Sequence, residues 1–283
     1  MSVRGLTVPV TVLVALCLSL ITIFAQLWLL NDLLLDFPQG DLFLLFGILL
    51  ASGLLFALAC RRICRLIADR SVLPPVWLTP MLNALARRFD IRPPEIHTLN
   101  SPGLNAFALQ GLSRRGHILL NVAMLTQLNQ DEVEAVLAHE CSHIASYHAM
   151  MLTVVQGMTL PMTLPIAVGA GLFYAFIYGL DKFRSAVLTL NHIMTVLLFP
   201  LTSIGLALFT RYWEFEADRQ AAQAVGTEKY ISVLQCLHGS FFQHPNLLEI
   251  SAGSSGRENR YAWALSHPSL TQRINALLEI GQR

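Results

Sequence analysis

Two histidines that lie one helical turn apart are the residues in this sequence best suited to chemistry. They belong to the segment His139-Glu140-Cys141-Ser142-His143. Four residues make about one turn of an α-helix, so both imidazoles project from one face and can bind one metal ion. Zinc suits this arrangement, and the adjacent Glu140 would then act as a general base toward water. The alternative is a solvated amphipathic helix in which these side chains share no role.

A catalytic zinc ion needs a third protein ligand, and an acidic segment farther along the chain can supply it. Residues 214–218 read EFEAD. Glu214 and Asp218 are one turn apart on one helix face, whereas Glu216 is rotated by about 200°. We therefore expect Glu214 to be the third ligand, and Asp218 to accept a hydrogen bond from the second nitrogen of a ligand histidine. The alternative is a surface cluster in which both carboxylates form ion pairs with nearby arginines.

The elements that carry these segments are indicated by hydrophobic spacing and by turn residues. Asn129 followed by Glu132 resembles a capping box, and helical spacing continues from there to His148. Further amphipathic helices are predicted near 79–89, 229–237 and 269–280, and short strands at 96–99, 106–109 and 117–120. Cys141 is rotated about 200° from His139 on its helix and should face the core. The strands suggest a small sheet beside the metal-binding helix.

Four stretches without a charged residue are each long enough to cross a membrane: 5–31, 42–60, 149–180 and 185–210. The first exceeds the apolar region of a cleavable signal peptide, so we interpret it as an uncleaved anchor. Arginines directly follow the second stretch, whereas the 32–41 connection is acidic. Because positive residues are enriched on the cytoplasmic side, both termini and the polar segments are predicted to be cytoplasmic.

The third and fourth stretches are less regular than the first two. Pro161 and Pro165 interrupt the third, and His192 lies in the fourth. Buried helices are the alternative to membrane spans for both. We favour spans because the length and apolarity of these stretches exceed what a small soluble core needs.

Composition agrees with a membrane protein. The chain has 283 residues, of which 54% are hydrophobic and 13% charged, and its net charge of +1 offers no basic surplus for nucleic acid. The five cysteines are odd in number, which argues against a disulfide scaffold and favours a reducing compartment for the polar part. We expect an α+β, helix-rich fold with multi-pass membrane helices. Its predicted parts are a membrane hairpin at 1–70, the first part of a cytoplasmic domain at 71–148, a second membrane hairpin at 149–210, and the second part of the domain at 211–283.

Four separated motifs resemble the HtpX-type membrane-integral zinc metalloproteases. They are residues 139–143, residues 214–218, the stretch 104–108, and Ser266-His267-Pro268 with Arg273-Ile274. The resemblance implies a gluzincin-type fold and one Zn²⁺ per chain. It also implies a multi-pass protein of the bacterial inner membrane that cleaves misfolded or damaged membrane proteins at the cytoplasmic face, as protein quality control.

Carried over position by position, the resemblance makes His139, His143 and Glu214 the zinc ligands and Glu140 the general base. It implies that His267 donates a hydrogen bond to the developing oxyanion. A capping or core histidine is the alternative there.

The resemblance also implies a strand at the edge of the cleft, to which an extended polypeptide adds through main-chain hydrogen bonds. Its residues are Asn105, Ala106, Phe107 and Ala108. A plain buried strand is the alternative.

Two other classes of function remain as hypotheses. A degenerate protease would hold polypeptides without cutting them, but it would have no reason to keep Glu140. A small transporter with a structural zinc ion would need ionisable residues within its spans, and His192 is the one candidate. Among the remaining histidines, which include His97 and His117, no spacing suggests a pairing.

Overall fold

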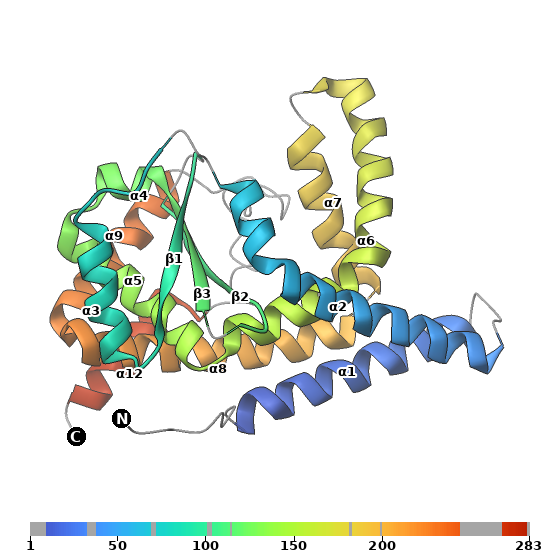
Figure 1. The fold of residues 1–283 in the computed structure, drawn as a ribbon, viewed down its shortest axis with the longest axis horizontal. Helices are drawn as coiled ribbons and strands as arrows, with labels where there is room; N and C mark the ends of the chain where they lie inside the picture. Colours follow the sequence, from blue (N-terminus) through green and yellow to red (C-terminus); the bar gives the residue numbers. More distant parts are fainter. Residues whose placement is uncertain are drawn as a thin grey trace.

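The computed structural model describes residues 10–32, 38–68, 72–100, 104–113, 115–180, 183–198, 200–243 and 268–281. A group of long apolar helices lies beside a smaller unit of helices and a sheet (Figure 1). The helices are α1 (Val10–Leu30), α2 (Gln39–Ile67), α3 (Leu78–Arg88), α4 (Val122–Gln127), α5 (Gln130–Ala145), α6 (His148–Tyr178), α7 (Phe183–Leu198), α8 (Pro200–Val225), α9 (Thr227–Gln243) and α12 (Leu270–Gly281). The strands are β1 (Arg92–Leu99), β2 (Ala106–Gln110) and β3 (Arg115–Asn121).

Three of the described helices, α1, α2 and α6, are long and apolar enough to cross a membrane. Large apolar side chains on these helices point outward instead of into a core. Leu55 of α2 is 64% exposed and Phe176 of α6 is 89% exposed. In water such a surface would be costly, whereas in a bilayer it faces lipid. The expectation of a multi-pass membrane protein is confirmed.

The expected fourth span does not form one helix. Residues 185–198 belong to α7, and residues 200–210 form the start of α8, which then continues into a polar half. A proline at position 200 supplies no backbone N–H, so it suits the first turn of a new helix. Within the described residues, neither α7 nor α8 meets the length and hydropathy of a spanning helix. Two helices therefore cover 185–210 in place of one, and a membrane span there stays a prediction. Helix α7 packs against α6 as the second arm of a hairpin.

The helix α6 bends along its length, so that its later turns rise together with α7 (Figure 1). Pro161 and Pro165 lie inside it, and prolines in a helix interior are a common cause of such bends. Its first half packs closely on α2 through glycines. A Cβ atom added at Gly157 would lie 2.6 Å from Phe56 Cβ and 3.0 Å from Gly53 Cα.

The sheet has the order β1-β3-β2, with β3 parallel to β1 and antiparallel to β2. Central β3 is buried along most of its length, as expected for a strand with neighbours on both sides. Strand β1 begins at Arg92 and includes Pro93 and Pro94, so it starts earlier than the strand expected at 96–99. Proline fixes φ in a range that an edge strand tolerates, which explains this extension.

The core of the smaller unit is formed by α3, α5, α9, α12 and the sheet, around side chains such as Leu85, Ile118 and Leu137. Asn129 and Glu132 form the predicted capping box at the start of α5. The helix ends at Ala145 and not at His148, because Tyr147 adopts a left-handed conformation, with φ 61°, between α5 and α6. Residues 139–143 thus lie in the last two turns of a well-packed helix.

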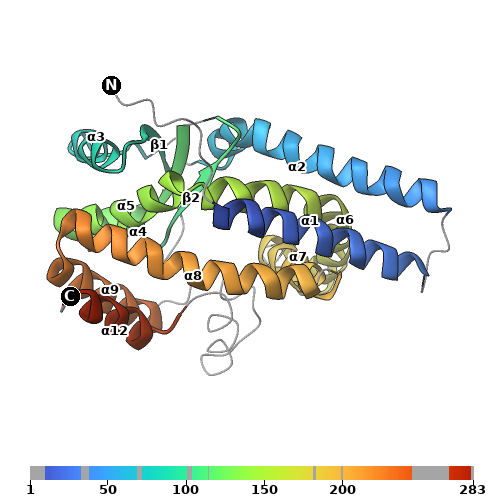
Figure 2. The same cartoon turned by 90° about the horizontal axis from the view of Figure 1, so that it is seen from below.

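Helix α8 connects the two parts of the molecule. Its first turns lie beside α1 and its later turns beside α5 and α9 (Figure 2). Residues from its middle therefore reach the helix that carries the two histidines.

Candidate metal centre

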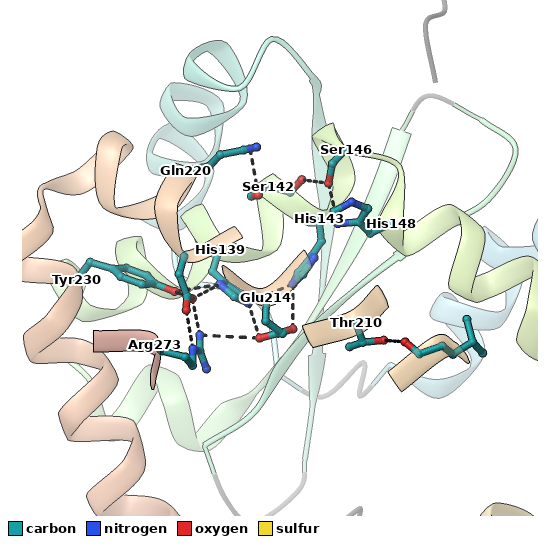
Figure 3. Close-up of polar contacts among 12 residues, drawn as sticks. His139, Ser142, His143, Ser146, His148, Thr210, Glu214, Gln220, Tyr230 and Arg273 are labelled. Atoms are coloured by element: carbon teal, nitrogen blue, oxygen red, sulfur yellow. Dashed lines mark hydrogen bonds and ion pairs between the residues drawn. The ribbon is translucent and has the colours of Figure 1, made fainter. Parts of the chain in front are cut away.

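Helix α5 brings His139 and His143 together, as the spacing predicts. Their Nε2 atoms are 3.1 Å apart, and their rings meet edge to face (Figure 3). The opposite side of α5 is packed in the core, where Leu137 and Cys141 are fully buried. The core therefore fixes the rotation of the helix and directs both imidazoles away from the core.

Glu214 of α8 faces the two imidazoles. Its carboxylate oxygens lie 3.6 Å from His139 Nε2 and 3.4 Å from His143 Nε2. These three residues offer ligand atoms that all lie within 4.8 Å of one another. Glu214 is only 5% exposed. The alternative of a solvated ion-pair cluster on the surface is therefore wrong.

Asp218, one turn along α8, lies on the far side of His139 from Glu214. Its Oδ1 atom is 3.2 Å from His139 Nδ1, and the residue is 1% exposed. The Tyr230 hydroxyl donates to the same Oδ1 at 2.7 Å and lies 2.9 Å from His139 Nδ1. These acceptors hold the ring proton on Nδ1, which leaves the Nε2 lone pair facing Glu214.

Arg273 of α12 secures Asp218 with a bidentate ion pair. The guanidinium donates to Oδ2 at 2.6 Å and to Oδ1 at 2.5 Å. Burial by itself would raise the pKa of Asp218, but the charge and hydrogen bonds of Arg273 outweigh it and lower that pKa. Asp218 is therefore an anion that orients His139.

Glu140 is 7% exposed and lies next to the two imidazoles. Burial raises the pKa of its carboxyl group, which the nearby His139 and His143 partly counteract. Its carboxylate also interacts with the backbone of Ala108 in β2. A carboxylate with a raised pKa between a candidate metal centre and an edge strand is suited to proton transfer.

The neighbouring acidic residue Glu216 points elsewhere, as its rotation on the helix predicts. It pairs with Arg219 at 2.5 Å and accepts from Gln220 at 2.6 Å. It therefore takes no part in the group around His139.

Two residues of the site were not assigned a role from the sequence. Tyr230 lies in the helix predicted near 229–237, in which no residue was given a role. Tyr230 and His139, which it contacts, are 91 residues apart in the sequence. Arg273 was quoted only as part of a motif. The available signal was the position of Arg273 one turn from Leu270 and from Leu277, on the apolar face of the closing helix, because a charge on such a face needs a partner. His267 and Ser266 lie outside the described residues.

Comparison with known proteins shows to which family the chain belongs. Residues 74–281 match Peptidase family M48. The chain belongs to peptidase family M48. It is 33% identical over 208 residues to Protease HtpX of Shewanella pealeana, which covers 71% of this chain and 72% of that protein. Protease HtpX of Shewanella halifaxensis matches at the same identity and coverage. The expected resemblance is confirmed, and the M48 chain is a membrane-associated metalloprotease.

A solved structure shares the fold of this M48 chain. The crystal structure of S. mikatae Ste24p superimposes with a TM-score of 0.51 at 17% sequence identity. The match covers 93% of this chain and 63% of Ste24p, so the M48 chain spans less than two thirds of that protein. The likeness therefore extends to the membrane helices as well as to the catalytic part.

Proposed function

We propose that this M48 protein is a zinc-dependent endopeptidase in which His139, His143 and Glu214 hold the metal ion. The observation that carries the proposal is the convergence of their ligand atoms within 4.8 Å from two helices. Two imidazoles and one carboxylate are the donor set of many catalytic zinc sites. Two nitrogens on a tetrahedral zinc ion lie about 3.3 Å apart, since Zn–N bonds are about 2.0–2.1 Å. The separation of 3.1 Å between the two Nε2 atoms suits that ion.

Each side chain around this group has a separate proposed role in peptide hydrolysis. Zinc held there supplies Lewis acidity toward water and toward the peptide carbonyl. Glu140 accepts the proton of the attacking water and passes it to the leaving amine. Asp218 and Tyr230 keep the His139 ring in the tautomer that presents Nε2. His267 is proposed, from its motif, to donate to the oxyanion.

The substrate is proposed to bind along β2. Among the described strands β2 lies at the sheet edge, and Ala108 in it contacts Glu140. An extended polypeptide added to residues 105–108 would therefore pass beside the general base. The proposed substrates are membrane proteins that are misfolded or damaged. The apolar helices favour this class because they place the site at a membrane.

The proposed placement is the bacterial inner membrane, with the catalytic part in the cytoplasm. Residues 71–148 and 211–283 would form that part, and 1–70 and 149–210 the membrane hairpins. Arg61, Arg62 and Arg65 at the end of α2 support this orientation.

The decisive experiment compares metal content and casein digestion by the detergent-purified protein. Glu140→Gln should keep zinc and lose digestion, because the amide preserves shape but cannot accept the proton. His139→Ala should lose zinc from this site and lose digestion. Removing a general base should slow digestion by at least about 100-fold. Digestion by Glu140→Gln at more than about one tenth of the wild-type rate would therefore refute the proposal.

A further inference from the structure

A second group of metal-binding side chains lies in the described part of the chain, away from Glu214. Cys64, His97 and His117 offer ligand atoms that all lie within 4.8 Å of one another. They come from three elements, α2, β1 and β3. His97 Nε2 is 3.1 Å from His117 Nδ1, the same separation as between the Nε2 atoms of His139 and His143. No residue is shared between the two groups.

Cys60 lies next to this group, although it is not one of the three residues whose ligand atoms all lie within 4.8 Å of one another. It lies one turn before Cys64 on the same face of α2, and the two thiols are hydrogen bonded. Both cysteines are free, and they are 3% and 0% exposed. If Cys60 joined these three residues, the two thiols and two imidazoles would make the Cys₂His₂ donor set of structural zinc sites.

Apolar side chains enclose the group. Leu119 is buried against both cysteines, and Leu99, Phe107 and Leu109 pack around them. The backbone is also tightly fixed here, because a Cβ atom at Gly111 would come within 2.2 Å of the Ala57 carbonyl oxygen. Cys64 and His117 are buried and His97 is mostly buried, which leaves little room for a substrate and favours a structural over a catalytic metal.

The acidic side chain of Glu95 lies beside this group and is already paired with cations. Glu95 lies 3.8 Å from His117 Nδ1 and 4.0 Å from His97 Nε2. It is engaged by arginines at 2.7 Å, 3.3 Å and 3.6 Å, those of Arg61, Arg115 and Arg65. Glu95 is therefore an ion-pair partner and not a ligand.

The alternative without a metal ion is a neutral pair of hydrogen-bonded imidazoles beside two small apolar thiols. The hydrogen bond alone would explain the 3.1 Å separation of the rings. It would not explain why a membrane helix places two thiols at the same point. Thiolate and imidazole together select zinc among the common divalent ions.

We propose that Cys60, Cys64, His97 and His117 bind a second zinc ion, which fastens the end of α2 to the sheet. The site goes beyond the proposed peptidase function and shares no ligand with it. Since β2 belongs to the same sheet, the second zinc ion would hold the strand of the proposed substrate site at a constant position relative to the membrane helices.

Cobalt substitution in the full-length protein tests this proposal. The protein is purified in detergent with a thiol reductant, stripped of metal and titrated with Co²⁺. Cobalt bound to thiolate gives a charge-transfer absorption that a site of two histidines and a glutamate cannot give. His139→Ala should therefore keep that absorption and one metal ion per chain.

Paired variants identify the ligands. In the His139→Ala background, adding Cys64→Ser or His97→Asn should abolish the thiolate absorption, whereas adding Cys236→Ser should preserve it. Circular dichroism confirms folding, and His97→Asn serves if the buried cysteine variant does not fold. Absence of the absorption from folded His139→Ala protein would overturn the proposal.

Metal counts separate this proposal from the peptidase proposal. Wild-type protein should hold two zinc ions per chain and His139→Ala one. Wild-type protein with one ion and His139→Ala with none would refute the second site and leave the peptidase site standing. Two ions in His139→Ala would refute the ligand role of His139 and leave the second site standing.

Discussion

At the scale of single residues, Asp218 connects three elements through one carboxylate. It contacts His139 of α5, Tyr230 of α9 and Arg273 of α12. Helix α8 supplies both Asp218 and Glu214, so one helix presents a candidate ligand and the group that orients another. The site is therefore supported from four helices.

Asp218→Asn should weaken zinc binding by about 10–100-fold, because the amide is a poorer acceptor for the Nδ1 proton of His139. Competition with a chromophoric chelator measures the affinity. Glu216→Gln is the matched control, since Glu216 lies on the same helix but pairs with Arg219. Equal zinc affinity in both variants would mean that Asp218 has no influence on the metal.

Arg273→Met should lower the free energy of unfolding by about 3 kcal/mol, because it leaves the buried Asp218 carboxylate without its cation. Thermal unfolding in detergent reports the loss. Arg219→Met removes an ion pair that is 40% exposed on the arginine side, and it should cost less than about 1 kcal/mol. Similar losses from the two variants would contradict the buried-pair interpretation.

At the scale of elements, the contact between α2 and α6 depends on small residues. Gly53 and Gly157 let the helices approach closely, and the Ser52 hydroxyl donates to the Gly157 carbonyl oxygen at 2.8 Å. Membrane helices commonly associate through such small residues, because lipid offers no hydrophobic driving force. This contact holds the start of α6 against the helix that ends at the sheet.

Gly157→Ala should destabilise the protein by about 1–3 kcal/mol, since the new methyl group would overlap Phe56 and Gly53. Gly169→Ala is the control in the same helix, because a Cβ atom there has no neighbour within 4 Å. The midpoint of thermal unfolding in detergent compares them. A Gly157→Ala protein as stable as Gly169→Ala would show that the two helices are not closely packed.

At the scale of the whole molecule, α8 joins the apolar helices to the catalytic part (Figure 2). The proposed metal ligands therefore lie close to the end of the membrane-associated helices. A polypeptide leaving the bilayer would have a short path to β2, which suits the proposed substrate class.

The proposed orientation predicts which introduced cysteines react with a membrane-impermeant reagent in intact cells. Asp41→Cys, at the start of α2, should be labelled, and Glu228→Cys, in α9, should be labelled only after lysis. Both positions are exposed, so accessibility is matched. The reverse pattern would place the catalytic part outside the cytoplasm.

The sequence by itself determined the pairs of residues that lie within one helix. His139 with His143, Glu214 with Asp218, and Asn129 with Glu132 have their predicted relation, because the α-helical repeat sets it locally. The apolar stretches likewise indicated the membrane helices, since their length and composition are local properties. Family membership followed from such local motifs.

Only the tertiary structure decided which distant elements meet. The sequence suggested no pairing for His97 and His117, yet the packing of β1 beside β3 places their rings within 3.1 Å. Tyr230 likewise reaches His139, 91 residues away in the sequence, because α9 packs on α5. The break between α7 and α8 was also missed, because charge-free length does not show where a helix ends. Contacts between elements depend on register and on the packing of a whole core, and neither is encoded in the spacing of a single segment.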